Sequence, residues 1–122
     1  SEVMDNLCYH DYDIAVGAED ECERLGRDIG DKHAMIMHNH GLLTCASTVA
    51  EAFYQMYILE NACKVQVDAM ASGADLHHTK ESAAKMLRDY GRVKPNKPSR
   101  SSRLAWPALL RMLDKLDDSY RS

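Results

Sequence analysis

The fold is decided by residues 33–51, which read HAMIMHNHGLLTCASTVAE. Residues 33–38 form a short apolar run between turn-forming residues, and such a run predicts a buried strand. Asn39-His40-Gly41 then predicts a tight connection, and residues 42–46 predict a second strand. Residues 33–46 are therefore expected to form a hairpin-like pair of strands.

A long helix is predicted directly after this pair. Thr48 and Glu51 have the spacing of a capping box, in which each side chain satisfies an exposed backbone N–H at the helix start. The helix should run to about residue 72, with Gly73 as its stop. Its main apolar stripe recurs at spacings of three and four: Val49, Ala52, Phe53, Met56, Leu59, Cys63, Val67 and Met70.

The same helix also carries apolar residues on its opposite side, at Tyr54, Ile58 and Val65. A helix with two apolar faces is either sandwiched inside a domain or packed against another subunit. Because the chain has few other elements to cover both faces, the pattern favours a partner that this chain does not supply.

Three further helices are predicted around this centre. Residues 19–29 have acidic residues in the first turn, where they favour the helix dipole, and Gly30 as a stop. A shorter helix should start at Thr79 and end at Gly91, and Trp106-Pro107 should open a last helix. Between them, residues 92–103 combine five basic residues with prolines and serines, which predicts a linker. A few short strands among long helices indicate an α/β or α+β class.

Composition fits one compact domain, with 122 residues, 45% hydrophobic and 28% charged. The net charge of −4 and the absence of a long basic block argue against nucleic acid as the main partner. Charged residues interrupt the longest apolar stretch, so no membrane span is expected, and no secretory leader is visible. The four cysteines show no CxxC pair and are interpreted as reduced thiols, which favours a cytoplasmic protein.

His38 and His40 are the most unusual local feature. Two histidines two residues apart on extended chain project to the same side, which suits a shared metal ion, whereas capping or turn hydrogen bonding is the simpler interpretation. Glu60 lies within the apolar arc of the long helix, where it is either a rim residue paired with Lys64 or a catalytic acid. His77-His78 are expected to be exposed loop residues, and His10 and His33 have no informative setting.

From Asn39 onward the sequence resembles the class II aldolase/adducin family. The resemblance rests on the Asn-His-Gly turn between strands, followed by EAF, LE, AC and Gln at the family's spacing over residues 51–66. Residues 10–13 upstream, and residues 106–114 with Ser119-Tyr120 downstream, also resemble the family. The resemblance implies a partial α-β-α layered domain with short antiparallel strands and flanking helices. Residues 1–91 would be the C-terminal part of that domain, residues 92–103 the linker and residues 104–122 a C-terminal helix.

The family resemblance also implies a divalent metal ion, usually Zn²⁺, held by three histidines. His40 matches the histidine of the Asn-His-Gly motif, whereas the other two would come from an upstream His-x-His that this chain does not contain. His38 occupies a position that is often Arg in the family, and it is a further candidate ligand beside His40. A C-terminal tyrosine assists proton transfer in family aldolases, often across a subunit boundary, and Tyr120 is the corresponding candidate here.

Two functions follow from the resemblance. The first is a subunit derived from a metal-dependent aldolase or epimerase that acts on small hydroxyketones or sugar phosphates. On this interpretation the chain is inactive alone. It would either assemble with further copies of itself as a homo-oligomer or pack against the missing N-terminal half of the domain. The alternative is a non-catalytic, adducin-like binding or scaffold module.

Overall fold

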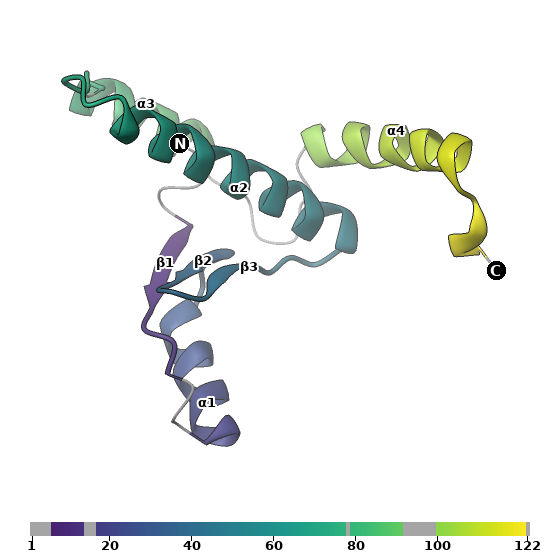
Figure 1. Cartoon of the computed structure of the whole chain (residues 1–122), viewed down its shortest axis with the longest axis horizontal. Coiled ribbons are helices and arrows are strands. Elements are labelled where there is room, and N and C mark those ends of the chain that lie inside the picture. The colour runs from purple at the N-terminus through teal and green to yellow at the C-terminus, as the bar shows by residue number, and fades with distance from the viewer. Residues whose placement is uncertain (1–5, 14–16, 78, 92–99, 122) are drawn as a thin grey trace.

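The computed structural model describes residues 6–13, 17–77, 79–91 and 100–121. In chain order its strands are β1 (Leu7–His10), β2 (Ala34–Met37) and β3 (Gly41–Thr44). The helices are α1 (Ala18–Ile29), α2 (Val49–Ala71), α3 (Glu81–Gly91) and α4 (Arg100–Leu116), and a short 3₁₀ turn, η1 (Ser119–Arg121), follows. This mixed α/β arrangement confirms the predicted fold class, and it is drawn in Figure 1.

The three strands form one sheet in the order β1-β2-β3. β2 and β3 pair antiparallel, with Met35 opposite Leu43, which confirms the predicted hairpin. β1 was not predicted from the sequence, and it pairs parallel to β2, with Cys8 opposite Met35. Parallel neighbours need a crossover, and α1 provides it by packing against β1. The expected antiparallel pairing therefore holds for two of the three strands.

The connection between β2 and β3 is a tight turn at residues 38–40. The His40 N–H donates to the Met37 carbonyl at 3.1 Å, and Asn39 adopts a positive φ of 56°, a conformation that Asn tolerates better than most residues. The expectation of two histidines on extended chain is therefore wrong at this point. The turn rotates the backbone between His38 and His40, so the period-two rule does not place their side chains on one side.

Helix α2 begins as predicted, with Thr48 as its N-cap. The Thr48 hydroxyl accepts a hydrogen bond from the Glu51 N–H at 3.2 Å. The second half of the capping box takes a different form, because the buried Glu51 carboxylate accepts a hydrogen bond from Ser102 of α4. Glu51 and Ser102 are 51 residues apart in sequence, so this bond joins the start of α2 to α4.

The apolar stripe of α2 is buried only in part. Leu59 is 1% exposed and, with Ala34 and Met35 of β2, forms the buried apolar core of the described residues. Val49, Phe53, Val67 and Met70 belong to the same stripe, yet each is exposed. α2 packs against β2, β3 and α4, and this packing leaves these members of its stripe exposed.

Helix α4 starts earlier than the sequence predicted. It begins at Arg100, so the last four residues of the predicted linker are helical, while residues 92–99 lie outside the described residues. Pro107 is consequently inside the helix rather than in its first turn. The reason is tertiary: Ser102 is buried against Glu51, and Trp106 makes an edge-to-face contact with Phe53 at 5.6 Å between ring centroids.

The end of α1, the cysteines and the length of the helices can also be compared with the sequence predictions. Helix α1 ends at Gly30 with a positive φ of 49°, as its predicted stop requires. All four cysteines are free thiols in this structure. Across the described ranges, no helix is long and apolar enough to cross a membrane.

Candidate functional site

A buried histidine at the end of β1 organises the polar part of the molecule. The His10 residue is 1% exposed, and each of its ring nitrogens lies 2.7 Å from a carboxylate oxygen of α1. Nε2 faces Glu21 and Nδ1 faces Asp28. Ionised carboxylates only accept hydrogen bonds, so both ring nitrogens must donate and the imidazole is doubly protonated in this arrangement.

The electrostatics agree with this protonation state. The hydrogen bond to Glu21, and then that to Asp28, raises the pKa of His10 above its ordinary value, and this outweighs the opposing effect of burial. The same bond from His10 lowers the pKa of Glu21 below its ordinary value. His10 and Glu21 therefore form a buried ion pair, supported by Asp28 at the surface.

This cluster extends from His10 to the turn between β2 and β3. Arg24 donates to Glu21 at 2.7 Å and to the Asp11 carbonyl at 2.8 Å. The Asp11 carboxylate lies 2.6 Å from Nδ1 of His38, and this bond lowers the pKa of Asp11 below its usual range. Tyr9, His10, Asp11, Arg24, Asp28 and His38 line a shallow polar cavity of about 270 Å³.

His40 is held by a different contact. Its imidazole stacks on the Tyr12 ring at 3.8 Å between centroids, with an angle of 18° between the ring planes. His40 is exposed, and no hydrogen bond to its ring is found among the described residues. The turn therefore presents one accessible imidazole on an aromatic platform.

The donors match a Zn²⁺-type ion in kind but not in number. Imidazole nitrogen is a preferred ligand of Zn²⁺, and a site of this kind needs three or four ligands. Within the described part of the chain, no group of three His, Cys, Asp or Glu side chains is arranged to hold a metal ion. The residues therefore fit one ligand position at His40, and they do not make a complete metal site.

The structure does not bring Tyr120 to this turn. Tyr120 follows α4, where its hydroxyl donates to Asp114 at 2.5 Å, and Figure 1 places this C-terminal segment at the opposite end of the molecule from the sheet. Glu60 pairs with Lys64 at 3.3 Å, and both side chains are exposed, as the rim interpretation predicts. His77 is exposed as expected, and His78 lies outside the described residues.

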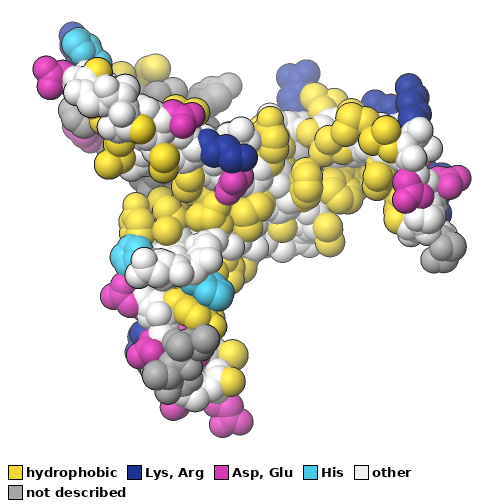
Figure 2. Space-filling model, viewed as in Figure 1, with side chains coloured by type: hydrophobic (Ala, Val, Ile, Leu, Met, Phe, Trp, Pro, Cys, Tyr) yellow, Lys and Arg dark blue, Asp and Glu magenta, His cyan; other side chains and the backbone are white. Residues whose placement is uncertain are grey.

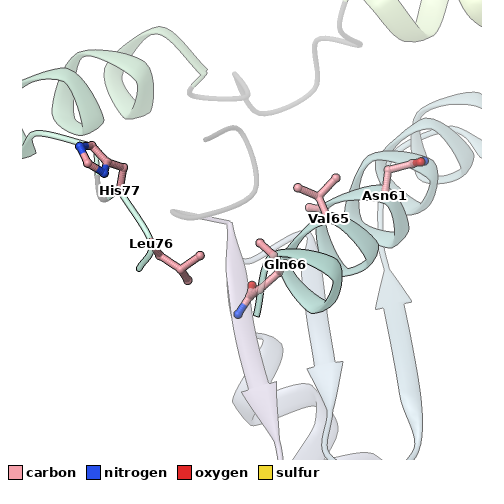
Figure 3. Close-up of a pocket in the computed structure, with 7 residues that line it drawn as sticks. Asn61, Val65, Gln66, Leu76 and His77 are labelled. Atoms are coloured by element: carbon pink, nitrogen blue, oxygen red, sulfur yellow. The ribbon is translucent and has the colours of Figure 1, made fainter. Parts of the chain in front are cut away.

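A second hollow is apolar and lies on α2. It has a volume of about 540 Å³ and is lined by Asn61, Ala62, Val65, Gln66, Ala69, Leu76 and His77. Figure 3 shows Leu76 and His77 of the following segment across from the side chains of α2. Apart from His77, this hollow contains none of the histidines or carboxylates described above, so it is suited to apolar contact rather than to metal chemistry.

Sequence reasoning missed His10 as a site residue. A signal was present in α1, where Glu21, Arg24 and Asp28 recur at spacings of three and four and therefore share one helix face. A polar face on a surface helix usually faces solvent, so this spacing alone did not indicate a buried partner. The partner itself could not be identified, because β1 had not been predicted.

The sequence matches the family described as Class II Aldolase and Adducin N-terminal domain over residues 2–67. A protein of Pseudomonas aeruginosa, provisionally named an aldolase class 2 protein, is 40% identical over 98% of this chain and 46% of its own length. An adducin-related protein of Schizosaccharomyces pombe is 33% identical over 95% of this chain and 37% of its own length.

A solved structure gives the same result. The crystal structure of an aldolase II superfamily protein from Pseudomonas syringae superposes with a TM-score of 0.84 at 33% identity, covering 96% of this chain and 46% of that one. The chain thus spans about half the length of the relatives it matches. Matches in sequence and in structure agree, and the chain belongs to the class II aldolase and adducin family.

Proposed function

We propose that this chain is the part of a class II aldolase-type domain that supplies His40 as one ligand of a divalent metal ion, with Zn²⁺ the first candidate. The observation that carries the proposal is the Asn39-His40-Gly41 turn, which exposes the His40 imidazole while Tyr12 holds one face of its ring. When bound, a divalent ion supplies Lewis-acid polarisation of a substrate oxygen. Small hydroxyketones or sugar phosphates are the proposed substrate class.

The 122-residue chain is proposed to have no aldolase turnover by itself. One exposed imidazole, with His38 as a second candidate, does not reach the three protein ligands of a catalytic zinc site. The remaining ligands would come from another part of the same domain or from another subunit. Any contribution of Tyr120 at His40 would also require a second copy, because Tyr120 is bound to Asp114 at the far end of its own chain.

The test is Zn²⁺ binding by the chain, measured by equilibrium dialysis, against His40→Ala. His77→Ala is the matched control, because His77 is also an exposed histidine and lies in a loop away from the turn. We expect weak binding that His40→Ala abolishes and His77→Ala preserves. Zinc binding that is the same in all three proteins would contradict the role of His40.

The alternative function is a non-catalytic, adducin-like binding module. The observation in its favour is the apolar hollow on α2, together with exposed apolar residues such as Val65 and Leu76 around it. An adducin-related protein is also among the relatives. The same dialysis experiment separates the two proposals, since a binding module of this kind predicts no His40-dependent zinc binding.

A further inference from the structure

The end of β1 contacts both histidines of the turn that joins β2 and β3. We propose that Asp11-Tyr12 is a positioning element, in which Tyr12 orients the imidazole of His40 and Asp11 orients that of His38. This inference rests on the proposed function of His40 as a metal ligand. It adds residues that touch the histidines rather than the metal ion.

The positioning element is itself fixed to the rest of the fold. His10 precedes it directly and is locked between Glu21 and Asp28 of α1. The Asp11 carbonyl accepts a hydrogen bond from Arg24, and the His10 carbonyl accepts one from the backbone N–H of His38 at 2.9 Å. Asp11 and Tyr12 therefore extend from an anchored point that is already bonded to the turn.

The geometry of the Tyr12 contact suits orientation of a ligand. The two rings are nearly parallel, with an interplanar angle of 18°, so Tyr12 covers one face of the His40 imidazole. The lone pair with which an imidazole binds a metal ion lies in the ring plane, at its edge. Stacking therefore limits the rotation of the ring and leaves its nitrogen atoms accessible.

The Asp11 contact selects one nitrogen of His38. Nδ1 of His38 lies 2.6 Å from the Asp11 carboxylate, which accepts a hydrogen bond, so Nδ1 carries the proton. Nε2 makes no hydrogen bond among the described residues and is available to a ligand. A histidine that binds zinc usually donates its other N–H to a carboxylate, a backbone carbonyl or water, and a carboxylate fixes the ring and increases its basicity.

The first test needs no metal. Protons above an aromatic face resonate upfield, so the stacked His40 ring protons of the unmodified chain should be shifted upfield in ¹H–¹³C NMR spectra. We expect Tyr12→Phe to retain this shift and Tyr12→Leu to lose it, with far-UV circular dichroism unchanged in both. An upfield shift that survives in Tyr12→Leu would overturn the proposed role of Tyr12.

The second test measures zinc affinity in the same variants and in Asp11→Ala. Because partners of metal ligands typically contribute 10- to 100-fold to affinity, Tyr12→Leu and Asp11→Ala should each weaken Zn²⁺ binding about tenfold, and Tyr12→Phe should not. Unchanged affinity in both Tyr12→Leu and Asp11→Ala, when His40→Ala abolishes binding, would overturn the positioning role alone. Insensitivity to His40→Ala would overturn the metal function instead, and the NMR shift would still report on the stacking.

Discussion

The sheet region and the helical region of this molecule differ in how their side chains are accommodated: one pairs buried charges, and the other leaves large apolar side chains exposed. In the sheet region, which comprises α1 and β1–β3, the buried charges of His10 and Glu21 are paired within the chain. In the helical region, which comprises α2–α4, large apolar side chains such as Val65, Met112 and Leu116 are exposed. Figure 2 shows hydrophobic side chains spread along α2 and α4, whereas acidic side chains are frequent around α1.

This difference separates the region whose contacts are made within the chain from the region whose apolar side chains are left uncovered. Hydrogen bonds and a ring stack within the chain join the end of β1 to the turn at residues 38–40. Exposed apolar surface along a helix is typical of an interface with another protein segment. The contacts that hold the candidate metal ligand are therefore internal to the chain, although its other ligands are not. The exposed apolar side chains of the helical region offer a surface on which additional protein is expected to pack.

The largest expected effect concerns the few buried positions of the helical region. Leu59→Ala removes the fully buried apolar side chain of α2 and should cost about 3 kcal/mol of unfolding free energy. Val65→Ala, on the same helix but 69% exposed, should change it by less than about 0.5 kcal/mol. Urea denaturation measures both. Equal losses would show that the outer side of α2 is packed rather than exposed.

In the sheet region, the sensitive residue is His10. His10→Gln removes two charge-assisted hydrogen bonds to buried or half-buried carboxylates, so it should cost about 2 kcal/mol. His77→Gln replaces an exposed histidine and should leave stability unchanged. If the thermal midpoints of these two variants coincide, the His10 cluster does not stabilise the sheet.

The His10 contribution should also depend on pH. Because the pKa of His10 is raised in the folded state, its stabilising effect is complete below the unfolded value of about 6.5 and is lost as pH rises through the folded value. The difference in thermal midpoint between the unmodified chain and His10→Gln should therefore shrink from pH 6 to pH 9. A difference that grows over this range would reverse the assigned charge state.

The smallest effect is expected at the junction of the two regions. Thr48→Ala removes the N-cap of α2 and should cost about 1 kcal/mol. Ser47→Ala alters the preceding exposed hydroxyl and serves as the control. Denaturation curves that do not distinguish the two variants would mean that the cap contributes little beyond the bond between Glu51 and Ser102.

Local patterns explain what the sequence could predict. The hairpin of β2 and β3 and the start of α2 depend on neighbouring residues, such as the Asn39-His40-Gly41 turn and the Thr48 cap, and both were predicted correctly. β1 has only four residues and is defined by its parallel pairing with β2, across the whole of α1. β2 and β3 are equally short, but the turn between them marks their pairing. Helix α1, rather than such a turn, joins β1 to its partner, so the strand and its His10 could not be recognised.

The start of α4 also depends on residues distant in sequence, so it could not be predicted from local patterns. Residues 100–103 have the composition of a linker, and they are helical because Ser102 meets Glu51, a residue 51 positions earlier. At the candidate site, the family motif identified His40, whereas the Tyr12 platform and the Asp11–His38 bond depend on the position of β1. The sequence thus identified the ligand candidate, and the structure was needed to find what holds it.

One measurement tests the central claim most directly: titration of the ¹⁵N-labelled chain with Zn²⁺, followed residue by residue in ¹H–¹⁵N NMR spectra. We predict that the earliest and largest changes occur at residues 38–41 and at Asp11 and Tyr12, around His40. Changes confined to the helical region, for example near His77 and the apolar hollow on α2, would contradict the assignment of His40 as the metal ligand.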